Sequence, residues 1–111
     1  PHPASIRQAQ GFVRDYQKAY GQTVGTYSLP AFDATNLLIA AIGRSIDDAG
    51  GQRPTRAQVL LEVSRTADYS GAMGLTSFDS RGDTNLMMVS AYQWMADTEA
   101  AGTFVAQITL K

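Results

Sequence analysis

The sequence predicts a small α/β chain in which three helices are followed by a β-hairpin or meander. Apolar residues recur at helical spacing in residues 4–20 and again in residues 30–49, whereas apolar and polar residues alternate strictly in residues 103–110. The length of 111 residues fits one domain. A content of 44% hydrophobic and 17% charged residues is typical of a globular chain and not of a disordered one.

The first helix is predicted over residues 4–20, and Gly21 supplies a left-handed C-terminal stop. Its apolar stripe consists of Ile6, Ala9, Phe12, Val13, Tyr16 and Tyr20. Residues 22–29 are expected to form an extended or irregular connection, because Pro30 disfavours a helical conformation at Leu29.

Pro30 is well placed in the first turn of a second helix over about 30–49, which Gly50 and Gly51 end. Its buried side is predicted to be Leu37, Leu38, Ala41, Ile42, Ser45 and Ile46. A third helix is predicted over about 56–67, since Thr55 and Gln58 have the spacing of a capping box. Its inward-facing residues are expected to be Val59, Leu60 and Val63.

The C-terminal part has the composition of strands and turns. A short strand is expected at 75–78 and a tight turn at 79–83, in which Gly82 is free to adopt a positive φ. Two longer strands follow at 86–95 and 103–110, joined by a polar loop at 96–102. The alternation of the last strand places Phe104, Ala106, Ile108 and Leu110 on one face.

Composition disfavours several classes of function. The chain has no cysteine and a single histidine, His2, so a thiol nucleophile, a thiolate metal site and a histidine-based catalytic triad are not expected. Its net charge of −1 gives no basic patch for nucleic acid. The longest apolar runs of about six residues are far shorter than a membrane span of ~20 residues. We therefore expect no enzyme activity, cofactor or metal.

Two motifs in the predicted turn have simpler explanations than a binding site. Arg81-Gly82-Asp83 spells a cell-adhesion tripeptide, but a turn explains it. Residues 79–83 lack the alternating acidic ligands and closing glutamate of a calcium loop.

The best-motivated site is the start of the second helix, where Tyr27, Ser28, Phe32 and Asp33 gather. A helix N-terminus carries unpaired N–H groups and a partial positive charge, so a ligand carboxylate could rest there against an apolar wall formed by Phe32. Alternatively, Ser28 caps the helix, Asp33 complements the helix dipole and Phe32 belongs to the core. The residues alone favour this second interpretation.

The order of motifs resembles the C-terminal third of type I periplasmic solute-binding proteins, most closely the branched-chain amino acid group that serves ATP-driven importers. Two motifs carry the resemblance: Phe32-Asp33-Ala34 at the opening of a long helix, and Gly71-x-x-Gly74-x-x-x-Phe78-Asp79-x-x-Gly82-Asp83. The resemblance covers residues 5–110.

The resemblance implies a two-lobe fold that closes on a ligand. Residues 4–20 and 84–110 would belong to the second lobe and residues 30–67 to the first, with crossovers near 22–29 and 71–78. The role of an aromatic residue near the cleft, where this family often has tyrosine, carries over to Phe32. The main residues that hold the amino and carboxylate groups of the ligand would lie in parts that this chain lacks.

The expected function is therefore that of a fragment of an extracytoplasmic solute-binding protein, which captures an amino acid or related organic acid for an ABC permease in the periplasm or outside the cell. An alternative is the ligand-sensing domain of a receptor or regulator with the same fold. A third class, a small independent enzyme or an oligomerisation domain, has no supporting motif. Residues 1–10 contain neither the apolar stretch of a signal peptide nor an initiator methionine, so the chain is expected to be a piece of a longer protein. Such a fragment is expected to self-associate.

Overall fold

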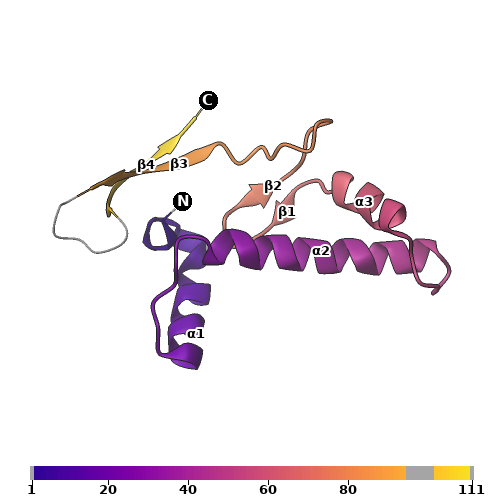
Figure 1. Cartoon of the computed structure of the whole chain (residues 1–111), viewed down its shortest axis with the longest axis horizontal. Helices are drawn as coiled ribbons and strands as arrows, with labels where there is room; N and C mark the ends of the chain where they lie inside the picture. Colours follow the sequence, from indigo (N-terminus) through magenta and orange to yellow (C-terminus); the bar gives the residue numbers. More distant parts are fainter. Residues whose placement is uncertain (1, 95–101, 111) are drawn as a thin grey trace. The chain divides into compact units, whose positions relative to one another are not determined.

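The computed structural model describes residues 2–94 and 102–110 and contains the predicted order of three helices followed by two small antiparallel sheets (Figure 1). The chain divides into two compact units, one made of Pro1–Thr26 with Met87–Lys111 and the other of Tyr27–Leu86. Within the described residues, no helix is long and apolar enough to cross a membrane.

The N-terminal helix of the first unit is shorter than predicted. Two 3₁₀ turns, η1 (Pro3–Ser5) and η2 (Arg7–Ala9), precede the α-helix α1 (Gln10–Tyr20). The predicted single helix is wrong here because Ile6 is extended, and the side-chain amide of Gln10 donates to the carbonyls of Pro3 and Ile6. The predicted end is confirmed, since Gly21 caps α1 with φ +65°.

The hairpin of the first unit pairs β3 (Met88–Gln93) with β4 (Thr103–Thr109), and both strands are slightly shorter than predicted. Ala91 pairs with Ala106 and Tyr92 with Phe104, which leaves Val105 as the extra residue of a β-bulge. The bulge shifts the alternation, so Phe104 and Gln107 are half-buried while Ile108 and Leu110 are about half exposed. The predicted apolar face is therefore wrong beyond Phe104. The predicted 96–102 loop lies almost entirely outside the described residues.

The second unit is built on the long helix α2 (Ser28–Asp48), which starts two residues earlier than predicted. Leu29 is helical and fully buried despite preceding Pro30. A proline is tolerated in a first turn because its missing N–H has no partner there in any helix. Gly50 and Gly51 end the helix with φ +63° and +82°, as predicted.

The buried face of α2 is a single row of residues four apart. It consists of Leu29, Asp33, Leu37, Ala41 and Ser45. The predicted flank of this row is wrong, because Leu38, Ile42 and Ile46 are exposed, as is Ile39. The chain packs α3 and a small hairpin against one side of α2 and leaves an aliphatic flank uncovered.

Helix α3 (Arg56–Ser64) starts where predicted, and the capping box of Thr55 and Gln58 is present in both directions. It ends three residues early, where the hydroxyls of Ser64 and Thr66 bond to carbonyls of the last turn. The expected burial of Leu60 is wrong, since this residue is 68% exposed, and the buried residue of α3 is Glu62.

After α3, strand β1 (Tyr69–Ser70) pairs with β2 (Leu75–Thr76), the shortened form of the strand predicted at 75–78. Phe78 and Thr84 form an isolated bridge around the predicted turn at 79–83. Gly82 in this turn has φ +85°, as expected.

Candidate ligand-binding surface

The start of α2 differs from the capped helix of the second interpretation. Tyr27 is the N-cap residue and no side chain caps the helix, so the expected capping by Ser28 is wrong. The first helical hydrogen bond runs from the N–H of Ala31 to the carbonyl of Tyr27, at 3.0 Å. Tyr27 is 83% exposed and Ser28 is half-buried. This end of the helix therefore offers an exposed aromatic ring and a hydroxyl beside backbone N–H groups.

Phe32 lies one turn further along α2 with 43% of its surface exposed. Within this chain Phe32 is therefore only partly buried. Its exposed part is compatible with the apolar wall that the sequence predicts.

Asp33 is buried, with 8% of its surface exposed, and its carboxylate serves a contact within the chain. Oδ1 accepts the N–H of Ala72 and Oδ2 accepts the N–H of Met73, each at 2.7 Å. Asp33 also lies in the second turn of α2, beyond the first turn where a carboxylate best complements the dipole. The burial of Tyr69 and, after it, the negative charge of Asp33 raise the pKa of the Tyr69 phenol.

A second buried carboxylate, Glu62, was not among the residues singled out from the sequence. Oε1 accepts from Arg65 at 2.8 Å and Oε2 from Arg44 at 3.1 Å, and a second nitrogen of Arg44 donates to the carbonyl of Glu62 at 3.0 Å. These hydrogen bonds, first from Arg65 and then from Arg44, lower the pKa of Glu62. The pair with Arg44 ties α3 to α2. The one sequence signal for the buried carboxylate of Glu62 was that it is a lone acidic residue within the apolar part of a short helix.

We expect Glu62 to make the stability of the chain depend on acid. Because its folded pKa is lowered, its stabilising contribution is complete above the unfolded value of about 4.3 and is lost as the pH falls through the folded value. The melting temperature of wild type should exceed that of Glu62→Gln at pH 7, and the difference should shrink below about pH 4.

The pKa of Asp79 is also lowered, by the backbone N–H groups of Asp83 and Arg81, so Asp79 adds its own acid dependence to the stability. Wild type and Glu62→Gln both contain Asp79, so this contribution cancels in the difference between their melting temperatures. Arg65→Gln removes the partner that lowers the pKa of Glu62 most, so the stabilising contribution of Glu62 should depend less on pH in this variant. A difference between wild type and Glu62→Gln that stays constant from pH 7 to pH 3 would contradict this assignment.

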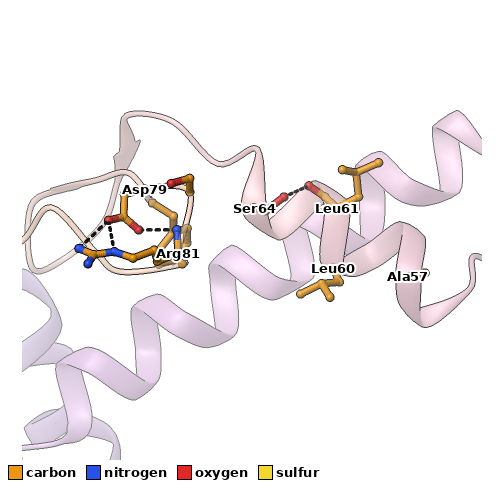
Figure 2. A pocket seen from close by; sticks show the side chains of 9 residues that line it. Ala57, Leu60, Leu61, Ser64, Asp79 and Arg81 are labelled. Carbon is orange, nitrogen blue, oxygen red and sulfur yellow. Dashed lines mark hydrogen bonds and ion pairs between the residues drawn. The ribbon is translucent and has the colours of Figure 1, made fainter.

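In the second unit, a hollow of about 660 Å³ lies between α3 and the turn at 79–83 (Figure 2). Leu60 and Leu61 line it from α3, and Asp79 and Arg81 line it from the turn. The Asp79 carboxylate accepts from the N–H groups of Arg81 and Asp83 at 2.8 and 2.9 Å, and it pairs with the Arg81 guanidinium at 3.3 Å. The turn is thus stabilised by its own residues.

The four predicted site residues do not line this hollow, nor the smaller one of about 430 Å³ beside Ile42 and Val59. The structure brings Tyr27, Ser28 and Phe32 together only as neighbours along α2. Among the described residues, no group of three or more His, Cys, Asp or Glu side chains could hold a metal ion.

Comparisons with known proteins find a match among solved structures. No protein-family model matches the sequence, and no curated protein matches it. Among solved structures, the chain is similar to the leucine-binding protein LivK of Thermotoga maritima, with a TM-score of 0.71 and 25% sequence identity. The match covers 98% of this chain and 29% of LivK, so the chain spans less than a third of that protein.

This match tests the resemblance that the sequence motifs predicted. The similarity extends over nearly the whole chain and includes the three helices and both small sheets. Over this length, the chain has the fold of one part of a periplasmic solute-binding protein, similar to a fragment of a leucine-binding protein.

Proposed function

We propose that the chain is part of a longer extracytoplasmic solute-binding protein, which captures an amino acid or a related small organic acid and delivers it to an ABC permease in the periplasm or outside the cell. The observation that carries this proposal is the match to a leucine-binding protein over 98% of the chain. The chain supplies 29% of such a fold, so the remainder would come from the rest of the longer protein.

In this proposal the two compact units belong to different lobes. Residues 4–20 and 84–110 would lie in the second lobe and residues 30–67 in the first, with crossovers near 22–29 and 71–78. The observed units change over between Thr26 and Tyr27 and between Leu86 and Met87, which supports the first crossover more closely than the second.

The ligand would meet the first lobe at the start of α2. Phe32 would form an apolar wall, and Tyr27 and Ser28 would supply an aromatic ring and a hydroxyl for polar contacts. Their position at the N-terminus of α2, where backbone N–H groups lack helical partners, supports this assignment.

The proposal is tested by calorimetry on the full-length protein that contains this chain, titrated with leucine, valine, phenylalanine and glutamate. Saturable binding of at least one amino acid supports the proposal. A regulator with the same fold would also bind a ligand, so the flanking sequence provides the second criterion: a secretory or lipoprotein signal supports a transport protein, whereas a DNA-binding segment supports a regulator.

We expect the 111-residue chain alone to bind none of these amino acids with a dissociation constant below about 100 μM, or −5.5 kcal/mol. Ligand pockets bury most of the surface of their ligand, and one part of a two-lobe cleft cannot do so. Calorimetry on the purified chain measures this directly. Saturable micromolar binding by a monomer of the chain would contradict the two-lobe proposal.

A further inference from the structure

A two-residue turn closes the β1–β2 hairpin. Two N–H groups of this turn find no acceptor within the turn itself. Gly71 donates to the carbonyl of Gly74 at 3.0 Å, and Gly74 donates back to Gly71 at 3.3 Å. Ala72 and Met73 are therefore the two central residues. In a turn of this kind their N–H groups point away from the ladder, and buried backbone donors need an acceptor.

Asp33 on α2 is that acceptor. Each of its carboxylate oxygens receives one of the two N–H groups at 2.7 Å, which is the short distance typical of a charge-assisted hydrogen bond. We call this arrangement of Asp33 with Ala72 and Met73 the Asp33–turn contact. It joins residues 39 and 40 positions apart in the sequence and attaches the hairpin to α2 (Figure 1).

Gly71 fits this contact because it has no side chain. A Cβ atom at this position would lie 2.5 Å from Oδ2 and 2.6 Å from Cγ of Asp33, closer than non-bonded atoms approach. The Asp33 side chain is short, buried and bonded through both oxygens, so it has little freedom to move away. The requirement for glycine thus depends on the presence of Asp33.

We infer that Asp33 is a positioning residue of the proposed binding surface: its carboxylate holds the 71–74 turn against α2 at the position that directly follows Phe32, and it does not itself contact the ligand. The part of this inference that concerns ligand binding rests on the proposed function. The Asp33–turn contact can be tested without any ligand, because it predicts a specific coupling between Asp33 and Gly71.

The first test is a double-mutant cycle on the 111-residue chain, followed by thermal melting. Gly71→Ala should lower the melting temperature clearly when Asp33 is present. The same substitution should change the melting temperature little in an Asp33→Ala background, because the atoms that the new Cβ would meet are gone. Gly43→Ala is the matched control, since Gly43 lies in α2 with nothing within 4 Å of its Cβ position, and it should not lower the melting temperature. Equal losses from Gly71→Ala in both backgrounds would overturn the inference.

Amide hydrogen exchange provides a measurement that does not require the alanine variant to fold. In Asp33→Asn, the side chain keeps its shape but has only one acceptor oxygen, so one of the two N–H groups of Ala72 and Met73 should lose protection by about 10- to 100-fold while the other keeps it. Unchanged protection at both positions would also overturn the inference.

The second test measures leucine affinity in the full-length protein. A positioning role predicts that Gly71→Ala weakens binding by about 3- to 30-fold although the carboxylate of Asp33 remains, and that Asp33→Ala adds little to this loss. A direct contact predicts that Asp33→Ala weakens binding while Gly71→Ala does not, which would contradict positioning. If the wild-type protein binds no amino acid, the proposed function fails, and the thermal cycle still decides whether the Asp33–turn contact exists.

Discussion

The 111-residue chain is expected to self-associate at micromolar concentration, so that light scattering after size exclusion gives at least twice the monomer mass. The reason is the amount of aliphatic surface that the chain leaves uncovered. Exposed residues of this kind lie on the flank of α2, on α3, on both strands of the β3–β4 hairpin and directly after β4: Leu38, Ile39, Ile42, Ile46, Leu60, Leu61, Val89, Val105, Ile108 and Leu110.

Fully burying a Leu or Ile side chain contributes about 1.5–3 kcal/mol, whereas a micromolar interface needs about 8 kcal/mol beyond the cost of association, so many of these residues must be buried together. A two-stranded hairpin is also marginal by itself, and exchange of β segments between copies is one way to cover its faces. Self-association is therefore expected of a chain that, in the proposed function, supplies only part of a two-lobe fold.

Two substitutions test the cause. Ile39→Lys and Leu60→Lys introduce a charge at side chains that are 61% and 68% exposed, and together they should shift the chain toward monomer. Gln22→Lys adds the same charge at an exposed polar position of the first unit, outside the α2–α3 surface, and should leave the mass unchanged. A clean wild-type monomer with a cooperative melt would contradict the prediction.

Local signals in the sequence located some of the helix ends, although the starts of α1 and α2 and the end of α3 differ from the prediction. Gly21 stops α1, and Thr55 with Gln58 starts α3, because these signals act between residues only a few positions apart. The burial of α2 was harder to predict. Its apolar residues cover more than one face, and the face that becomes buried depends on α3 and the hairpin, which come later in the sequence. The bulge at Val105 likewise depends on pairing between strands.

The candidate site shows the same limit. The sequence placed Phe32 and Asp33 near a helix start, and the structure agrees with that location. The partners of Asp33 lie 39 and 40 residues away, so their link was not visible in local spacing. The pattern Gly71-x-x-Gly74 belongs to the motif that carries the resemblance, but its connection to the carboxylate of Asp33 is visible only in the folded chain.

Phe32→Ala in the full-length protein is expected to weaken leucine binding by about 5- to 30-fold, or about 1–2 kcal/mol. Burying a whole side chain of this size contributes about 1.5–3 kcal/mol, and only part of the ring would face the ligand. Calorimetry gives the affinity, and a thermal melt of the same variant gives the stability.

The two measurements separate a ligand wall from a core residue. A core phenylalanine replaced by alanine costs about 3–5 kcal/mol of stability and leaves the affinity of the folded fraction largely intact. Because Phe32 is 43% exposed, we expect a smaller loss of stability and a clear loss of affinity. Leu60→Ala is the control, since Leu60 is an exposed apolar residue of the same unit outside the proposed surface, and its loss should not change leucine affinity. A large fall in the melting temperature of Phe32→Ala with unchanged affinity would assign Phe32 to the core and remove the apolar wall from the proposed site.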